Sequence, residues 1–407
     1  MAGCSGGGTS SLSLRVTAGP VPFDDASAIT ISGADASHPL TVEASARDDA
    51  GVIWTSQAEF TPAADGTVNL ATAAPHSGSY PGAHATGPIW SMSAGSEHSV
   101  FSTRTAAAMT VTFTASQPGR SSVTARQGRS FRARGVTVTD VESSAGFVGM
   151  MFTPSRPAPN GGAALVLGGS EGGLGASVVP AEALASSGHP ALALAYFAAS
   201  GLPPTLTGIP LEYFARALTW LDEQPGVDPR RTTVIGASRG SEAVLLLGAD
   251  CPDLVHAVIA TSPTSFVHGG LPDVTKPAWT WHGRPVPFDS TAPLQAVTPV
   301  NPAAAIPVGR IHGPVLLLCG GDDQLWPSCP SSDVIRKQLS ASAVTDLREP
   351  GAGHLVDFFV PNLPLASTTA SNGTETLLTV GGTVQADALG RLAAWPAVLR
   401  FLDSIPG

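Results

Sequence analysis

The stretch VIGASRGSEAVLLLG, residues 234–248, decides the fold of the larger part of this chain. A β-branched run ends at Gly236, Ser238 stands two residues later, Gly240 follows, and an apolar helix-forming segment comes next. A G-x-S-x-G sequence between a strand and a helix is typical of a nucleophile elbow, a sharp turn that lifts a serine above a sheet. Gly236 and Gly240 are expected to be the elbow glycines, because chains pass so closely at this turn that only small residues fit.

Apolar strands alternate with helical segments on both sides of this elbow. Each strand ends in a glycine or a polar turn, a pattern that specifies a mostly parallel sheet with helices on both faces, as in an α/β hydrolase. Ligands of such sheets bind beyond the carboxyl ends of the strands, so functional residues are expected just after the apolar runs. The expected strands are AALVL (163–167), HPALALAYF (189–197), RTTVI (231–235), HAVIA (256–260) and GPVLLLC (313–319), and LEYFARALTWLDEQ (211–224) is expected to be an amphipathic helix.

The preceding part of the chain has a different pattern. Runs such as AITIS, LTVEASARD and MTVTFTAS alternate with period two and are bounded by Gly, Pro, Asp or Ser, which indicates an antiparallel β-sandwich. With 407 residues, two domains are expected. We predict a flexible tail over residues 1–16, an all-β sandwich domain over 17–140, and an α/β-hydrolase catalytic domain over 141–407.

Composition excludes several classes of function. Charged residues make up only 13% of the chain, the formal net charge is −10, and Lys and Arg never cluster, so no nucleic-acid partner is expected. No run of about 18 consecutive apolar residues occurs, which excludes a membrane-spanning helix. The glycine-rich loop GGSEGG (168–173) lacks the G-x-x-x-x-G-K-[ST] pattern of a nucleotide-binding loop. The four cysteines lack the spacing of zinc ligands or of a redox pair, so no metal or other cofactor is predicted.

The cysteines and the first residues suggest further features. Cys319 lies in an apolar run and is expected to be a small core residue, while Cys251 and Cys329 are a candidate disulfide pair. The start MAGCSGG resembles the cleavage region of a bacterial lipoprotein, with Cys4 before a Gly/Ser tether, but no apolar segment precedes it. Two alternatives stand: a cell-envelope lipoprotein anchored at Cys4 after removal of a signal peptide, or a cytoplasmic protein with Cys4 in a disordered tail. Nineteen arginines against two lysines favour a bacterial genome of high GC content.

Two more side chains form a candidate catalytic triad with Ser238. A serine hydroxyl becomes a good nucleophile when an oriented base takes its proton, and in α/β hydrolases the chain order is serine, acid, histidine. After the strand VLLLC comes GGDDQLWP (320–327), in which we prefer Asp323 as the acid, while Asp322 is expected to form the turn. His354 follows the last expected strand in EPGAGHL (349–355) and is the candidate general base.

A hydrolase of this kind also needs an oxyanion hole made of two backbone N–H groups. One is expected to be the N–H of Arg239, the residue after the nucleophile. The other is expected to come from the loop GGSEGG, from either Ser170 or Glu171.

These motifs together resemble the acyl-CoA thioesterase and bile acid-CoA:amino acid N-acyltransferase family. The resemblance covers nearly the whole chain after the tail; it rests on RDDAGVIWTSQAEFTPAADGTVNLATAAPHSGSYPGAHATGPIWSM in the first domain and on LVLGGSEGG, VIGASRGSE, IPVGRIHGPVLLLCGGDDQLWPS and PGAGHLVDFFVPNLP in the second. It implies an immunoglobulin-like β-sandwich followed by an α/β-hydrolase domain, with the nucleophile, acid and base at Ser238, Asp323 and His354. The chain departs from the family at Gly309, where an acidic residue is usual.

The resemblance also implies an activity. Members that conjugate acyl groups to amino acids use a cysteine nucleophile, whereas Ser238 would form an oxyester, which favours water as the acceptor. The implied enzyme is a serine-dependent acyl-CoA thioester hydrolase that releases a carboxylic (fatty) acid and CoA through an acyl-serine intermediate. An exported carboxylesterase or an acyltransferase with the same triad are the alternatives.

Two sets of side chains are candidates for contact with the substrate, and each also has a purely structural interpretation. Arg239, Arg284 and Arg310 are candidates for a basic rim around the phosphates of coenzyme A, or else solvated surface residues. Trp279 and Trp281, in the insertion after the strand at 256–260, either cap an acyl pocket or pack in the interior.

Overall fold

The computed structural model describes residues 11–95, 101–102, 108–159, 162–340, 343–364, 369–371 and 377–407. The chain divides into two compact units, with the main division between Ser130 and Phe131. This is earlier than the predicted boundary at residues 140 and 141, which would cut strand β10 (Thr137–Val141) of the second unit. Cys4 lies outside the described residues, whereas Ser13–Val16, within the predicted tail, forms strand β1 and pairs with β3.

The first unit consists of two β-sheets, as predicted for a sandwich. One sheet has the strand order β1-β3-β6 and the other β2-β9-β8-β4-β5-β7. Along β4 and β5 every second residue is buried, because one face of each sheet packs inward while the other meets solvent. The strands are β1 Ser13–Val16, β2 Pro20–Pro22, β3 Ile29–Ser32, β4 Leu40–Arg47, β5 Ile53–Phe60, β6 Val68–Asn69, β7 Ser77–Gly78, β8 Ala108–Ser116 and β9 Val123–Ser130, with a short helix α1 at Gly87–Trp90.

The second unit is built on an eight-stranded sheet of order β10-β11-β13-β12-β15-β16-β19-β20. The two strands β10 and β11 run antiparallel to their neighbours, and the remaining strand pairs are parallel. The central strands are buried along their whole length, as expected of a sheet covered on both faces. Their bounds are β10 Thr137–Val141, β11 Val148–Thr153, β12 Ala164–Leu167, β13 Ala191–Ala195, β15 Thr233–Ala237, β16 Ala257–Thr261, β19 Val315–Gly320 and β20 Val344–Glu349.

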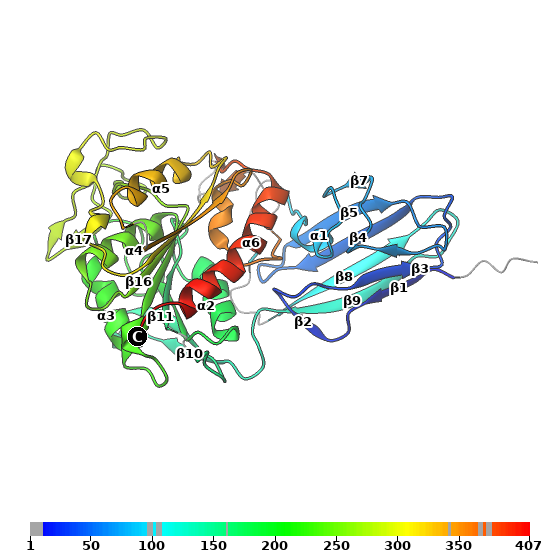
Figure 1. Ribbon diagram of the computed structural model, residues 1–407, viewed down its shortest axis with the longest axis horizontal. Helices are drawn as coiled ribbons and strands as arrows, with labels where there is room; N and C mark the ends of the chain where they lie inside the picture. Colours follow the sequence, from blue (N-terminus) through cyan, green and yellow to red (C-terminus); the bar gives the residue numbers. More distant parts are fainter. Residues whose placement is uncertain are drawn as a thin grey trace, which may run out of the picture. The chain divides into compact units, whose positions relative to one another are not determined.

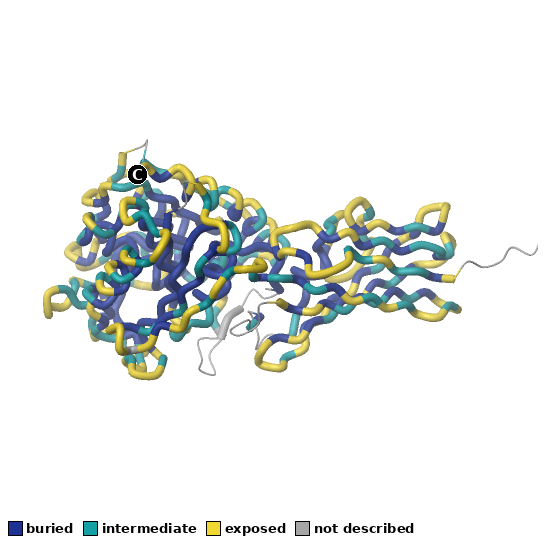
Figure 2. Tube along the Cα trace, turned by 90° about the horizontal axis from the view of Figure 1, so that it is seen from below, coloured by how far each residue is buried: buried dark blue, intermediate teal, exposed yellow. Residues whose placement is uncertain are grey.

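Helices cover both faces of this sheet. Figure 1 shows α2 and α6 on one face and α3 and α4 on the other. The amphipathic helix predicted over 211–224 is α3, and its apolar side joins the core formed with α4 and the strands. Figure 2 shows the strands of this unit as buried and its loops as largely exposed. The α/β-hydrolase class with a preceding β-sandwich is therefore confirmed. The helices are α2 Gly175–Ser186, α3 Leu211–Asp222, α4 Arg239–Asp250, α5 Ser328–Arg336 and α6 Val384–Asp403.

The segment between β16 and β19 carries the insertion noted in the sequence. Two of its strands, β17 (Trp279–Trp281) and β18 (Arg284–Pro285), join β14 (Ile209–Pro210) in a small separate sheet. Trp279 is fully buried in the core. Of the two alternatives, it therefore packs in the interior. A hairpin of β21 (Thr369–Ser371) and β22 (Leu377–Thr379) precedes α6.

The cysteines pair differently from the expectation. Cys319 forms a disulfide with Cys329, while Cys251 is buried and free. Cys319 lies near the end of β19 and Cys329 is the second residue of α5, and the tight turn between these elements brings the two together. Cys319 is fully buried, as expected of a core residue, but it is also disulfide-bonded. The candidate pair of Cys251 with Cys329 was wrong.

Candidate active site

The predicted elbow forms between β15 and α4. Ser238 lies between the last strand residue, Ala237, and the first helix residue, Arg239. Its backbone angles, φ 53° and ψ −118°, are ones that non-glycine residues rarely adopt, at a cost of about 1–3 kcal/mol. A Cβ atom on Gly236 would lie 2.2 Å from the Gly240 carbonyl oxygen, so the first elbow glycine is required by close packing.

Gly240 is required for a second close approach. A Cβ atom placed there would lie 2.3 Å from the carbonyl oxygen of Gly168, at the start of the loop after β12. The start of α4 therefore rests directly on the glycine-rich loop, which brings this loop next to the serine. The two elbow glycines thus hold three segments at van der Waals distance: the end of β15, the start of α4 and the loop after β12.

The structure brings the three candidate catalytic side chains together at the carboxyl ends of the parallel strands. Nε2 of His354 is 2.9 Å from Oγ of Ser238, and Nδ1 of His354 is 2.9 Å from Oδ2 of Asp323. Ser238 is 8% exposed, and the side chains of His354 and Asp323 are 4% and 1% exposed. A carboxylate at Nδ1 fixes the proton on that nitrogen when the ring is neutral, so Nε2 is the atom free to accept the serine proton.

Asp323 rather than Asp322 contacts the histidine. Oδ1 of Asp323 accepts the backbone N–H groups of Leu325 and Trp326, at 3.0 and 3.2 Å, so the carboxylate is anchored within its own turn. Asp322 is exposed, and its carboxylate accepts the N–H of Gly382. The turn after β19 therefore divides the two neighbouring aspartates between a buried and a solvent-facing position.

The pKa of His354 reflects several nearby carboxyl groups. Burial by itself would lower this pKa, but the negative charges of Asp323, Asp357 and Asp387 outweigh burial and raise the pKa of His354 to about 9. Asp357 and Asp387 are themselves buried, and burial raises their pKa values to about 7 and about 6. His354 therefore stands among acidic groups that do not all carry charge at neutral pH.

Backbone contacts hold His354 in position. Its N–H donates to the carbonyl oxygen of Val380, and its own carbonyl oxygen accepts the hydroxyl of Ser262 at 2.8 Å. The indole of Trp326 meets the imidazole edge-on, with ring centroids 5.4 Å apart, and its Nε1 donates to the carbonyl oxygen of Ser262. The histidine is thus fixed by Ser262, directly after β16, by the turn after β19 and by the segment before α6.

The predicted oxyanion donors lie on the two segments next to the serine. Arg239 is the first residue of α4, so its N–H has no partner within the helix. In the loop after β12, the carboxylate of Glu171 accepts the N–H of Gly169 at 2.7 Å. A Cβ on Gly169 would lie 3.0 Å from Cβ of Ser238, so this loop touches the nucleophile. The assignment of Ser170 or Glu171 as the second donor stays a prediction.

A buried polar network, which the sequence did not reveal, lies under the elbow. Glu242 is fully buried in α4, and its Oε1 is 3.1 Å from Nε of Arg239 and 2.9 Å from Nδ1 of His268. Its Oε2 accepts Nε1–H of Trp279 at 2.9 Å. Burial alone would raise the pKa of Glu242, but Arg239 and the hydrogen-bond donors hold it below its ordinary value. Glu242 therefore ties the start of α4 to the insertion after β16.

This network corrects one candidate for the basic rim. The Arg239 side chain is only 6% exposed and donates to the carbonyl oxygens of Gly269 and His268, so it cannot line an open surface. Arg310 forms an ion pair with Asp250, and Arg284 lies exposed in β18. No spacing rule in the sequence signals that a residue next to the nucleophile turns inward.

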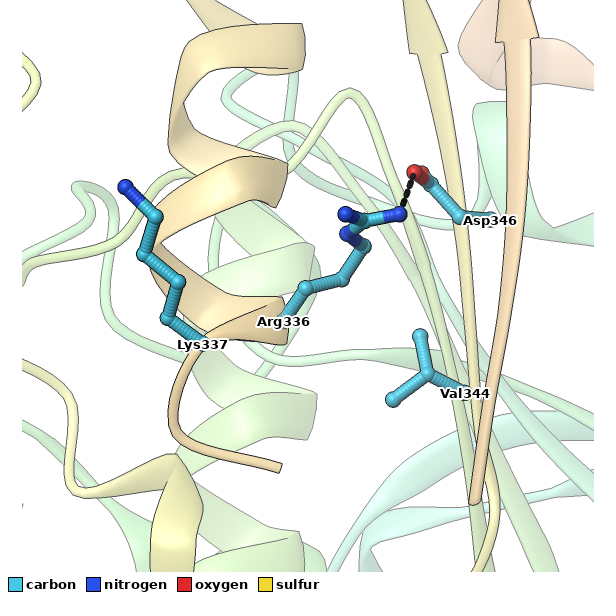
Figure 3. A pocket seen from close by; sticks show the side chains of 4 residues that line it. All are labelled: Arg336, Lys337, Val344 and Asp346. Atoms are coloured by element: carbon cyan, nitrogen blue, oxygen red, sulfur yellow. Dashed lines mark hydrogen bonds and ion pairs between the residues drawn. The ribbon is translucent and has the colours of Figure 1, made fainter. Parts of the chain in front are cut away.

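A pocket of about 310 Å³ lies elsewhere in the second unit and is lined by Arg336, Lys337, Val344 and Asp346 (Figure 3). Nη1 of Arg336 donates to Oδ2 of Asp346 at 3.2 Å across it. Val344 begins β20, whereas His354 follows the end of that strand, so this pocket is not part of the candidate active site.

Two kinds of feature are absent from the part of the chain that the structure describes. Within it, no group of three or more His, Cys, Asp or Glu side chains could hold a metal ion. None of the helices described is both long and apolar enough to cross a membrane.

Comparisons with known proteins identify the family of the chain. The family model described as "Acyl-CoA thioester hydrolase/BAAT N-terminal region" matches residues 24–143, and that described as "BAAT / Acyl-CoA thioester hydrolase C terminal" matches residues 209–405. Mouse mitochondrial acyl-coenzyme A thioesterase 2 is 27% identical over 93% of this chain and 86% of its own length. Rat acyl-coenzyme A thioesterase 1 is 28% identical over 94% of each chain.

Solved structures resemble this chain more distantly. TT1662 from Thermus thermophilus has a TM-score of 0.42 and 18% identity, over 67% of this chain and 99% of its own. A dienelactone hydrolase from Anabaena variabilis has a TM-score of 0.36 and 18% identity, over 54% of this chain and 88% of its own. The two family models match segments of both units, and the curated relatives align along nearly the whole sequence. This chain therefore belongs to the acyl-CoA thioester hydrolase/BAAT family and is a hydrolase of the α/β type.

Proposed function

We propose that this chain is a serine-dependent acyl-CoA thioester hydrolase that releases a carboxylic acid and coenzyme A through an acyl-serine intermediate. The observation that carries the proposal is the hydrogen-bonded series from Oγ of Ser238 through His354 to Asp323, with both distances at 2.9 Å. The membership of the chain in the acyl-CoA thioester hydrolase/BAAT family supports a thioester as the bond that is cleaved.

In the first half of the reaction, Oγ of Ser238 attacks the thioester carbonyl while Nε2 of His354 takes the serine proton. The carbonyl oxygen becomes an oxyanion near the N-terminus of α4, where the free N–H of Arg239 and the helix dipole favour negative charge. The C–S bond then breaks, the acyl group stays on Ser238, and the thiolate leaves with the proton from Nε2.

In the second half, water takes the place of the thiol. Nε2 of His354 accepts a proton from this water as its oxygen attacks the acyl-serine, and returns the proton to Oγ of Ser238 when the acid is released. Asp323 stabilises the imidazolium in both halves, because its carboxylate is 2.9 Å from Nδ1 and is held by two backbone N–H groups. An oxyester is the expected intermediate of a serine nucleophile, which favours water over an amine as the acceptor.

A carboxylesterase acting on oxyesters is the second candidate. The disulfide between Cys319 and Cys329 is the observation that favours it, because disulfides persist mainly in oxidising compartments such as the cell envelope. Acyl-CoA is a metabolite of the cytoplasm, so an exported enzyme with this triad would act on another ester.

The test compares two substrate classes on the same protein. We expect release of free thiol from a chain-length series of acyl-CoA substrates, with kcat/KM above that for p-nitrophenyl esters of the same acyl chains. Ser238→Ala should lower both activities by roughly a thousandfold or more. Ser241→Ala is the matched control, because that hydroxyl is buried in the same helix and has no hydrogen-bond partner in the described structure. Turnover of p-nitrophenyl esters without thiol release would favour the carboxylesterase, and full activity of Ser238→Ala would refute both.

A further inference from the structure

A second buried carboxyl group, that of Asp357, lies beside the candidate base. His354 and Asp357 both belong to the short 3-10 helix η6 (His354–Phe358), whose three-residue period places them on the same edge. Oδ2 of Asp357 is 3.8 Å from Nε2 of His354, and the Asp357 side chain is 4% exposed. Since Nε2 also faces Ser238, the imidazole has Asp323 at one ring nitrogen and Asp357 near the other.

Asp357 is the least supported of these carboxyl groups as an anion. Its Oδ1 is buried and accepts no hydrogen bond from the described residues, and its Oδ2 is too far from Nε2 for a hydrogen bond. By contrast, Asp323 accepts two backbone N–H groups, and Asp387 accepts the N–H of Gly353 at 2.7 Å. A buried carboxylate without donors is costly, so a proton is most readily retained by Asp357.

Ionisable groups face Asp357 from every element around it. They are His354 on η6, Asp323 from the turn after β19, Glu171 from the loop after β12, and Asp387 and Arg391 on α6. Arg391 is fully buried, and burial lowers its pKa to about 10, so it remains a cation at neutral pH. One permanent cation among four carboxyl groups cannot support four negative charges in a site shielded from water.

We propose that Asp357 and His354 share one proton in the resting enzyme, an inference that rests on the proposed function. Asp357 thereby sets the pH at which His354 can take the proton of Ser238. With the proton on Nε2, His354 is an imidazolium and Asp357 a carboxylate, and the base is blocked. With the proton on the carboxyl group, both side chains are neutral and Nε2 accepts the serine proton. The exchange leaves the total charge unchanged, and Asp357 acts on the reaction only through His354.

The first test is the pH dependence of kcat/KM for acyl-CoA hydrolysis in the wild type and in Asp357→Asn, which is isosteric and cannot hold the shared proton. The wild type should rise to its plateau in two overlapping steps, as expected of a coupled pair. The variant should rise in a single step and reach its plateau at a pH about one unit lower, roughly a tenfold gain in relative kcat/KM on the acid side. Asp322→Asn is the matched control; it removes an exposed negative charge from the turn after β19 and should leave the midpoint unchanged.

The second test does not depend on turnover. The His354 imidazole is titrated by NMR in Ser238→Ala, with and without Asp357→Asn, and the added substitution should lower the pKa of His354 by about one unit. If Asp357→Asn does not fold, Asp357→Ser provides a second neutral variant with the same expectation. The proposal is overturned if the kcat/KM midpoint and the His354 titration are both unmoved in a folded neutral variant, because a merely structural role lowers the plateau without shifting it. Failure of the proposed function is recognised separately, as absence of thioester hydrolysis in the wild type while the NMR titration still shifts.

Discussion

Neutralising Glu242 tests whether the buried network under the elbow holds the second unit together. The Glu242 side chain is 0% exposed and that of Arg239 is 6% exposed, with the charged atoms 3.1 Å apart. Glu242→Gln leaves the Arg239 guanidinium buried without a counter-charge, and turns an amide N–H group toward the indole N–H of Trp279 or toward His268. Breaking a buried ion pair from one side costs about 3–5 kcal/mol, so we expect the free energy of unfolding to fall by that amount.

The assay is urea unfolding of the wild type, Glu242→Gln, and the double variant Arg239→Met/Glu242→Leu. The double variant removes both charges and should recover at least half of the loss, because no buried charge is left unpaired. Glu223→Gln, at the exposed end of α3, is the control and should change stability by no more than about 0.5 kcal/mol. A loss below about 1 kcal/mol in Glu242→Gln, or a double variant no more stable than Glu242→Gln, would contradict a stabilising role of this ion pair.

The elbow glycine, the candidate base and the disulfide can each be tested by one further experiment. Gly236→Ala should reduce both the free energy of unfolding and kcat/KM, because the added Cβ would lie 2.2 Å from the Gly240 carbonyl oxygen. Denaturation and steady-state rates check this, and a variant with the stability and kcat/KM of the wild type would contradict it. Since neighbouring carboxylates raise the pKa of His354 and the neutral imidazole is the base, kcat/KM should increase from neutral to alkaline pH; a profile that is flat there would contradict this. Cys329→Ser opens a disulfide between residues ten apart and should cost about 3 kcal/mol, seen as a lower Tm than that of the oxidised wild type; equal Tm values would contradict it.

The sequence predicted the catalytic side chains because such residues stand shortly after the strands of an α/β sheet. Ser238 and Asp323 come just after runs that could be recognised as buried strands, whereas His354 follows β20, whose residues are only partly buried. Parallel strands bring their carboxyl ends to one edge of the sheet. The alternating runs of the first unit identified the sandwich for the same reason, since period two is visible in the letters themselves. These features depend on local pattern and on the topology that the pattern implies.

The features that escaped prediction depend on contacts between distant segments. Glu242 reads as an ordinary helix residue until the insertion brings His268 and Trp279 against it. Asp357 has no motif of its own, and its place beside Nε2 of His354 follows from the 3-10 geometry of η6, which periodicity in the sequence does not announce. Cys319 is the core residue that its apolar neighbours indicate, but its disulfide partner, Cys329, is set by the turn into α5 and could not be predicted from those neighbours.

The nucleophile is identified most directly by the mass of the protein after reaction with a fluorophosphonate. We expect one equivalent of phosphonate per chain, located on the peptide that contains Ser238, with thioesterase activity lost in proportion to labelling. Labelling should disappear in Ser238→Ala and persist in Ser241→Ala. Modification at a different serine, or a fully labelled Ser238 with undiminished thioester hydrolysis, would contradict the assignment of this residue as the nucleophile.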